Sequence, residues 1–261
     1  MKLYTYGKKE QPVIMLIPGT CCHHSLFNRV VPFLQEYFYT IVVSFDGFDE
    51  TEKTVYPTMT EETEKIEQYI IDNFDGSICC AYGCSLGGSF VSYMVQRKKV
   101  HIRHAVIGSS DMDEACSFVA KLEGKMMGAF MYQAIDTGHL PRWMNAINEK
   151  QMARNPEAAQ YRRDFLGIFM NQELRNGVVK KESIYRQFYY DLITKIEDDI
   201  DIPDTEIHVF YALKMGKKYR KRYLRHFAHP DIREQNMKHE EFFFRYPQEW
   251  VAEILSCCNM L

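Results

Sequence analysis

A serine flanked by glycines is the residue of this chain with the clearest chemical potential. Ser85 lies in the stretch AYGCSLGGSF, residues 81–90, where Gly83, Ser85 and Gly87 fit the pattern G-x-S-x-G. An apolar segment precedes the serine and a helical pattern follows it, which predicts a sharp strand-to-helix turn that exposes the hydroxyl at a helix N-terminus. Such a serine can act as a nucleophile, because the helix amides favour developing negative charge. The alternative is a glycine-rich turn whose serine has no chemical role.

Short apolar runs predict the strands that would position this turn. They are apolar on both faces, as strands of a parallel sheet covered by helices on both sides are. The runs cover residues 13–17, 41–45, 77–82 and 104–108. Helical patterns separate them, at residues 25–37, 58–74 and 85–97, and Thr58 and Glu61 have capping-box spacing. The alternation predicts an α/β fold with a doubly wound, mostly parallel sheet.

The strand pattern stops after residue 111 and returns only at residues 206–212. A segment this long cannot be a bare loop, so we expect residues 112–200 to form a helical cap on a core of residues 1–111 and 201–261. Methionine and aromatic residues recur in it at helical intervals, which suits an adaptable apolar pocket and equally suits plain core. A basic helix at 217–227, a weak strand near Ile232 and a last helix at 247–258 complete the pattern.

Composition excludes several classes of protein. The 261 residues suffice for one α/β core, and 46% hydrophobic and 26% charged residues are ordinary for a globular protein. A net charge of -3 is too small to collect nucleic acid or anionic membrane, so we expect neither as a partner and a small molecule instead. The first residues lack the pattern of a secretory signal, and no apolar run approaches the roughly 18 residues of a membrane span, which predicts a cytoplasmic protein.

The 8 cysteines include three adjacent pairs and no Cys-x-x-Cys spacing. Neighbouring cysteines rarely bond each other, and these pairs lie in apolar stretches. Reduced, buried thiols are therefore favoured over a disulfide scaffold or a zinc site. We expect no metal and no organic cofactor.

In its order of motifs the sequence resembles the α/β-hydrolase superfamily over nearly its whole length. The resemblance rests on the strand that ends in Pro18-Gly19-Thr20, the strand-to-helix turn at Ser85, a cap insertion and a late His239. The resemblance implies that the backbone N–H groups of Thr20 and Leu86 form an oxyanion hole and that His239 is the base. The alternatives are an ordinary turn at residues 18–20 and a surface histidine in a charged loop. His23 and His24 stand beside the predicted oxyanion loop and are candidates to line the pocket.

The acid of the triad departs from the family pattern. The family places an Asp or Glu after the strand that corresponds to residues 206–212, where this chain has Leu213 to Lys218 and no carboxylate. Some members carry the acid after the preceding strand, which here runs into Asp111, with Asp113 behind it. We therefore predict Asp111 as the group that orients His239. The alternatives are that Asp111 caps the first cap helix, or that a Ser-His dyad works without an acid.

Together these features predict a serine hydrolase of the carboxylesterase or thioesterase type that cleaves a small carboxylic ester or thioester through an acyl-enzyme on Ser85. Two alternatives stay open. One is an acyltransferase or lyase on the same fold, because the fold does not fix the reaction. The other is a non-catalytic ligand-binding homologue that has lost the acid.

Overall fold

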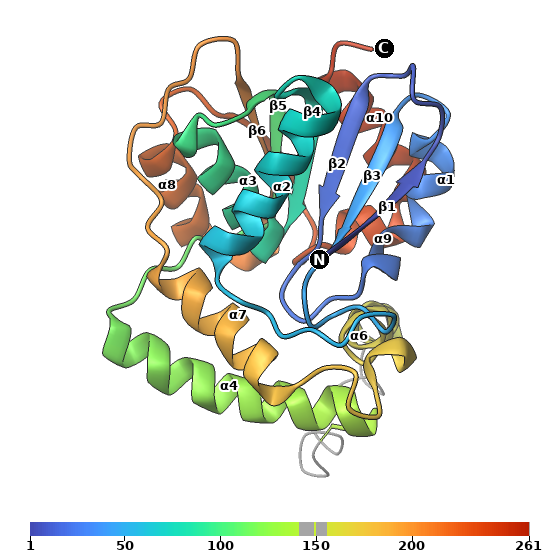
Figure 1. Ribbon diagram of the computed structural model, residues 1–261, viewed down its shortest axis with the longest axis vertical. Coiled ribbons are helices and arrows are strands. Elements are labelled where there is room, and N and C mark those ends of the chain that lie inside the picture. The colour runs from blue at the N-terminus through green and yellow to red at the C-terminus, as the bar shows by residue number, and fades with distance from the viewer. Residues whose placement is uncertain (141–148, 150–155, 261) are drawn as a thin grey trace.

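A mostly parallel β-sheet forms the centre of the computed structural model, which describes residues 1–140, 149 and 156–260 (Figure 1). Within these residues the sheet has seven strands in the order β1-β3-β2-β4-β5-β6-β7. β1 runs antiparallel to β3, and the other pairs are parallel. The strands are β1 (Lys2–Tyr6), β2 (Val13–Ile17), β3 (Tyr39–Ser44), β4 (Ser77–Cys84), β5 (His101–Gly108), β6 (Glu206–Ala212) and β7 (Asp231–Gln235). The predicted doubly wound α/β fold is confirmed.

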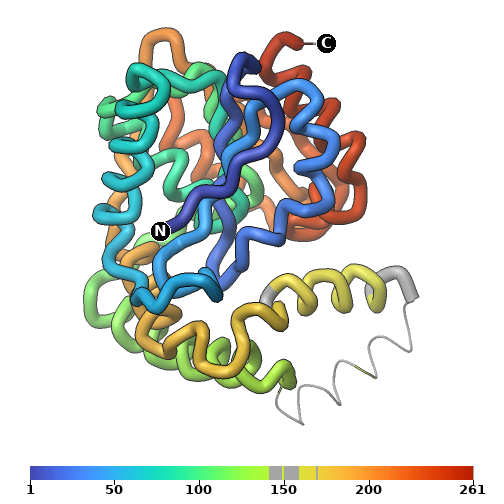
Figure 2. The backbone as a smooth tube through the Cα atoms, turned by 45° about the vertical axis from the view of Figure 1, so that its right-hand side comes forward, coloured from blue at the N-terminus to red at the C-terminus, as the bar shows by residue number. Residues whose placement is uncertain are grey.

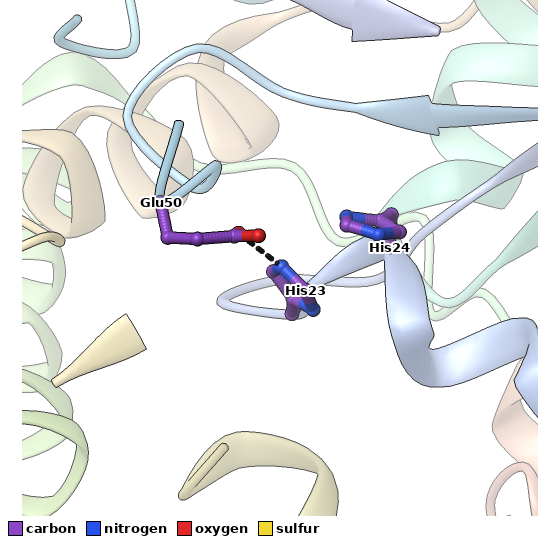
Figure 3. A group of neighbouring side chains, drawn as sticks. All are labelled: His23, His24 and Glu50. Atoms are coloured by element: carbon purple, nitrogen blue, oxygen red, sulfur yellow. Dashed lines mark hydrogen bonds and ion pairs between the residues drawn. The ribbon is translucent and has the colours of Figure 1, made fainter. Parts of the chain in front are cut away.

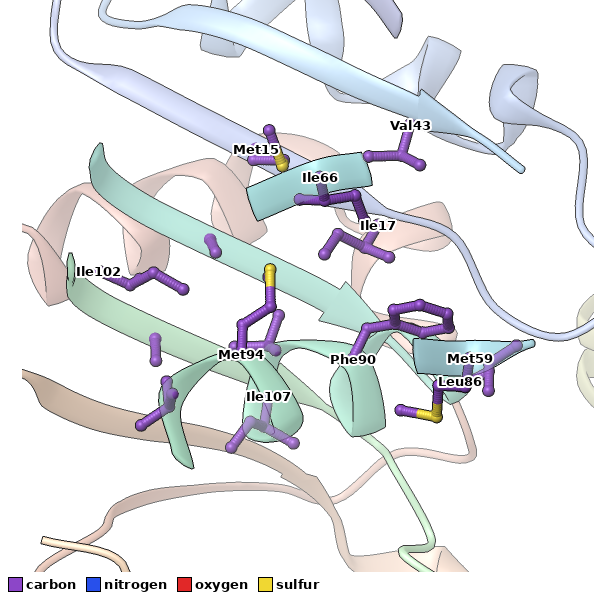
Figure 4. Close-up of a cluster of buried hydrophobic side chains, with 14 of the residues drawn as sticks. Met15, Ile17, Val43, Met59, Ile66, Leu86, Phe90, Met94, Ile102 and Ile107 are labelled. Carbon is purple, nitrogen blue, oxygen red and sulfur yellow. The ribbon is translucent and has the colours of Figure 1, made fainter. Parts of the chain in front are cut away.

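Three helices cover one face of this sheet: α2 (Met59–Phe74), α3 (Leu86–Arg97) and α8 (Lys217–His226). Figure 4 shows part of the layer, where Met15 and Ile17 of β2 and Val43 of β3 lie near Ile66 of α2 and Met94 of α3. All five side chains are fully buried. Burying a side chain of this size stabilises the fold by about 1.5–3 kcal/mol, so this layer holds α3, and with it the serine turn, on the sheet.

The opposite face packs against α1 (Val31–Leu34), α9 (Glu241–Arg245) and α10 (Pro247–Cys257). Trp250 of α10 is fully buried and meets the ring of Tyr82 edge-on, with ring centroids 4.7 Å apart. Tyr82 belongs to β4, the strand that leads to Ser85. The last helix of the chain therefore packs directly under the strand that carries the candidate nucleophile.

Between β5 and β6 the described chain is helical, with α4 (Ser117–Thr137), α6 (Pro156–Phe169), η2 (Gln172–Leu174) and α7 (Lys181–Ile193). These helices lie together at one end of the sheet (Figures 1 and 2). α4 approaches α7 closely, because a Cβ on Gly124 would lie only 3.1 Å from the ring of Tyr185. The boundaries of the predicted cap stay predictions, and its residues 141–148 and 150–155 lie outside the described residues.

Several predicted elements agree with the structure, and one helix does not. The capping box of α2 is confirmed, because the Thr58 hydroxyl accepts from the N–H of Glu61 at 3.0 Å. The helix predicted at 25–37 is wrong: a 3₁₀ helix, η1 (His24–Arg29), precedes the four-residue α1. Pro32 is the physical reason, because proline has no N–H to donate and is tolerated only in the first turn of a helix. The edge strand β1 was not predicted, and its half-exposed residues give no buried run to detect.

The state of the cysteines and the presence of a membrane-spanning helix can both be compared with the sequence predictions. All 8 cysteines are free, and all but Cys79 and Cys116 are buried, in agreement with the predicted thiols. Within the described residues no helix combines the length and the apolar character needed to cross a membrane.

Candidate active site

Ser85 sits at the junction of β4 and α3 with backbone angles φ 50° and ψ −113°. A serine seldom adopts a positive φ, and a non-glycine residue held there stores about 1–3 kcal/mol of strain. The surroundings hold this geometry, because the Ser85 N–H donates to the carbonyl of Gly108 at 2.8 Å and to the carboxylate of Glu240 at 3.1 Å. The side chain is half-buried and lines two cavities. The turn therefore presents a hydroxyl to a space that a ligand can enter.

The two glycines of the motif make the turn sterically possible. A Cβ on Gly83 would overlap the backbone of Gly87, and a Cβ on Gly87 would overlap the carbonyl of Ile17 at the end of β2. Neither residue has a positive φ, so the requirement is close approach of backbones and not a special conformation. The spacing G-x-S-x-G thus follows from the way the ends of β2, β4 and α3 pack together.

The two amides predicted for an oxyanion hole belong to Thr20 and Leu86. Neither the Thr20 N–H nor the Leu86 N–H donates to a protein acceptor within the described part of the chain. Both positions adjoin Ser85: Thr20 lines the same two cavities, and Leu86 is the first residue of α3. The loop after Thr20 is tied to the cap by the side chain of Gln187 in α7, which accepts from the Cys21 N–H at 2.8 Å.

His239 lies between β7 and α9 and shares with Ser85 a cavity of about 50 Å³. Its ring meets that of Phe165 edge-on at 6.1 Å, and its carbonyl accepts from the hydroxyl of Tyr161 at 3.0 Å. Burial lowers the pKa of His239, and the nearby Glu240 opposes this shift. Within the described residues no hydrogen bond joins the imidazole to the Ser85 hydroxyl, although both border one cavity.

Glu240 is a buried member of the site that the sequence analysis did not single out. One carboxylate oxygen accepts from the Ser85 N–H, and the other accepts from the Tyr82 hydroxyl at 2.9 Å. Burial raises the pKa of Glu240, while His239 and the two donors oppose this shift. Glu240 and Ala212 line one small cavity, and Ala212 ends β6, the strand after which the family pattern places the acid. The available sequence signal was its position directly after His239.

Asp111 lies in the loop after β5 and lines the larger of the two cavities at Ser85. Its carboxylate accepts from the N–H of Asp113 at 3.4 Å, and its carbonyl accepts from Arg222 of α8. Within the described residues it makes no hydrogen bond or ion pair with His239, so its role as the acid stays a prediction. The capping alternative is wrong, because α4 begins six residues later, at Ser117, with Cys116 as its N-cap.

A larger cavity of about 380 Å³ opens beside Ser85 under the cap helices. Its apolar walls come mainly from α4, α6 and α7, among them Met127, Phe130 and Phe188. Four carboxylates also border it: Asp111, Asp113, Glu123 and Asp191. Burial raises the pKa of both Asp111 and Asp191. The cavity can hold a mostly apolar group, and the burial that raises these two pKa values also disfavours a negatively charged ligand.

His23 and His24 do not line either cavity. Figure 3 shows His23 pointing toward Glu50, with its Nε2 2.7 Å from the Glu50 carboxylate. The other ring nitrogen of His23 is 2.8 Å from the hydroxyl of Ser25. His24 stacks on Tyr4, with ring centroids 3.8 Å apart. These contacts brace the loop after Thr20, and His239 is the histidine that shares the smaller cavity with Ser85.

Comparison with known proteins identifies the fold. No protein-family model and no curated protein sequence matches the chain. A structure described as an α/β-hydrolase family protein from Desulfitobacterium hafniense aligns with 97% of this chain and 100% of its own, at TM-score 0.74 and 17% identity. A hydrolase from Pseudomonas aeruginosa aligns with 98% of this chain and 92% of its own, at TM-score 0.72 and 14% identity.

MenH from S. aureus is similar over 99% of this chain and 97% of its own, at TM-score 0.71 and 12% identity. The TM-scores of these matches establish a shared fold. The sequence identities are too low to infer a shared substrate. The chain has the α/β-hydrolase fold, with Ser85 placed at the turn between β4 and α3 and with helices inserted between β5 and β6.

Proposed function

We propose that this protein is a serine hydrolase that cleaves a small carboxylic ester or thioester through an acyl-enzyme on Ser85. The observation that carries the proposal is the strained backbone of Ser85, φ 50° and ψ −113°. Near it are the amides of Thr20 and Leu86, which donate to no acceptor within the described part of the chain. Strain of this kind persists only where the surroundings enforce it, and it concentrates at functional sites. A serine without a chemical role would only lower the stability of the fold through this strain.

In the proposed reaction the Ser85 hydroxyl attacks the acyl carbonyl while His239 takes its proton. The carbonyl oxygen becomes negative and accepts from the N–H groups of Thr20 and Leu86, each of which lowers the barrier by about 3 kcal/mol. His239 then returns the proton to the leaving alcohol or thiol, and the carbonyl re-forms as the acyl-enzyme. Water, activated by the same histidine, releases the acid. This route uses no metal and no cofactor.

The base must come closer to the serine for this step. His239 and Ser85 border one cavity of about 50 Å³, so the imidazole and the hydroxyl face a common space. Hydrogen bonds between catalytic groups are often long without substrate and tighten when it binds. We keep Asp111 as the proposed acid, on the grounds of its position after β5. Glu240 is the competing carboxylate, because its charge acts on His239.

The larger cavity supports a substrate with an apolar acyl group. Its walls of Met127, Phe130 and Met131 are adaptable, because methionine and aromatic side chains fit varied shapes. Burial raises the pKa of Asp111 and Asp191 on its wall, and the same desolvation disfavours a substrate with a free carboxylate in that position. The cytoplasmic location stays a prediction from the sequence.

The decisive experiment is labelling of the purified protein with a fluorophosphonate probe, read by intact mass. We expect one adduct per chain in the wild type and in the control Ser117→Ala, whose serine is exposed in α4. Ser85→Ala should give none. An adduct that survives in Ser85→Ala would overturn the assignment of the nucleophile.

A well-folded wild type with no adduct would favour the non-catalytic ligand-binding alternative. One observation favours this alternative: within the described residues, no hydrogen bond links His239 to Ser85 or to Asp111. If labelling succeeds, product analysis with added alcohols or amines separates hydrolysis from acyl transfer.

A further inference from the structure

Three ligand-type side chains converge on neighbouring strands, in a region that contributes nothing to the cavities at Ser85. His104 of β5 and Glu206 of β6 are partners in the parallel register, and His208 follows Glu206 by two residues on the same face of β6. One nitrogen from each histidine and one oxygen from Glu206 lie within 4.8 Å of one another. The strand register thus brings together two imidazoles and a carboxylate.

The facing nitrogens of the two histidines are buried and unpaired. Nδ1 of His104 and Nε2 of His208 each lie 3.6 Å from the same oxygen of Glu206, and among the residues that the structure describes neither has a hydrogen-bond partner. Their side chains are only 3% and 5% exposed. A buried nitrogen without a partner costs about 1–3 kcal/mol, so two that point toward one oxygen require an explanation.

Asp231 fixes the orientation of His208. Its Oδ2 lies 3.0 Å from Nδ1 of His208, and because a carboxylate can only accept, Nδ1 carries the proton. The lone pair is then on Nε2, which is the nitrogen that faces Glu206. A carboxylate behind the distal nitrogen of a histidine is the usual second-layer partner of a metal-binding histidine. Asp231 is itself held by Arg233 at 2.9 Å.

We propose that His104, His208 and Glu206 form a binding site for a divalent zinc-class cation. Two ligands on a tetrahedral ion with bonds of about 2.0–2.1 Å lie roughly 3.3–3.4 Å apart, close to the two observed separations of 3.6 Å. Imidazole and carboxylate donors suit zinc. Glu206 is 58% exposed, so the ion has a path from solvent and the fourth position is left for water or an incoming group.

A second group of the same composition, His23, His24 and Glu50, fits a metal less well (Figure 3). Both ring nitrogens of His23 already have partners, Ser25 at 2.8 Å and Glu50 at 2.7 Å. No lone pair of His23 is left for an ion without breaking one of these contacts. The two groups therefore differ in whether their histidines have a free lone pair for an ion. Substitutions in the group at His23 serve as controls for the group at His208.

The test is zinc binding by the full chain, measured by competition with a chromogenic chelator under reducing conditions. We expect one zinc per wild-type chain and at least a tenfold weaker affinity in Glu206→Gln, a nearly isosteric change at an exposed side chain. His208→Gln should lose the site, and Asp231→Ala should weaken it about 10–100-fold through the orientation of His208. His229→Gln and Glu234→Gln, at exposed positions in the same region, should bind like the wild type.

Zinc should also raise the melting temperature of the wild type and not that of Glu206→Gln, because a ligand stabilises the state it binds. Co²⁺ substitution provides a further readout, since thiolate ligands give a charge-transfer band that imidazole and carboxylate ligands do not. Zinc binding that survives in Glu206→Gln, that is lost in His23→Gln, or that shows thiolate bands would overturn the proposal. So would the absence of zinc binding in wild-type protein. None of these readouts depends on Ser85.

Discussion

The backbone N–H of Ser85 donates to Oε1 of Glu240 at 3.1 Å, although 155 positions separate the two residues. Through Oε2 the same carboxylate accepts from Tyr82 of β4. Glu240 also follows His239 directly. One buried side chain thus connects the strand before the nucleophile, the nucleophile itself and the segment that carries the candidate base.

Glu240→Ala is expected to lower the free energy of unfolding by about 2–4 kcal/mol, because it leaves the buried Tyr82 hydroxyl without its acceptor and opens a cavity. Glu240→Gln keeps an acceptor for the Ser85 N–H and should cost about 1 kcal/mol. Urea denaturation followed by circular dichroism measures both. Glu249→Ala, at an exposed position in α10, is the control and should stay within about 0.5 kcal/mol of the wild type. Equal losses of unfolding free energy in Glu240→Ala and Glu240→Gln would contradict the role of Glu240 as a buried hydrogen-bond acceptor.

Ser85→Gly should be more stable than Ser85→Ala by about 1 kcal/mol or more, although glycine usually destabilises. At φ 50° and ψ −113° any Cβ is strained, and glycine removes that strain. Urea denaturation of the two variants side by side gives the difference. Ser92→Gly against Ser92→Ala, inside α3, is the matched control and should show the opposite order. If glycine were also the less stable variant at position 85, the turn would not be strained.

Asp111→Asn should slow fluorophosphonate labelling by up to about 10⁴-fold if Asp111 orients His239, because the amide favours the wrong tautomer of the histidine. Asp113→Asn, on the neighbouring carboxylate, should have a much smaller effect. Rate constants from intact-mass time courses measure both. An unchanged rate in Asp111→Asn, together with a large loss in Glu240→Gln, would move the acid role to Glu240.

The labelling rate should fall with decreasing pH at a lower midpoint than it would with an ordinary histidine as the base. Burial lowers the pKa of His239 from 6.5, and the base works only when it is neutral. The rate is therefore expected to fall as the pH drops through the lowered pKa, with a midpoint below 6.5. For the same reason, protonation of His239 weakens the folded state on the acid side. A pH series of labelling rates tests this, and a midpoint at or above 6.5 would exclude His239 as the base described here.

The sequence determined the features of this protein that are local in the chain. Apolar runs marked β2 and β6, the capping box marked the start of α2, and the glycine pattern marked Ser85, because each depends on residues a few positions apart. The same local signals failed at residues 25–37, where one continuous helix was expected and η1 and α1 form instead, and at the half-exposed edge strand β1.

Tertiary structure decided which distant groups meet. The carboxylate of Glu240 reaches Ser85 only because the loop after β7 folds back over the end of β4, and no spacing in the chain reports that. His104 and His208 face Glu206 because β5 and β6 pair in one particular register. A shift of one residue would turn these side chains to the other face of the sheet. Register and loop direction depend on the packing of the whole core, whereas sequence periodicity reports only which face of an element is buried.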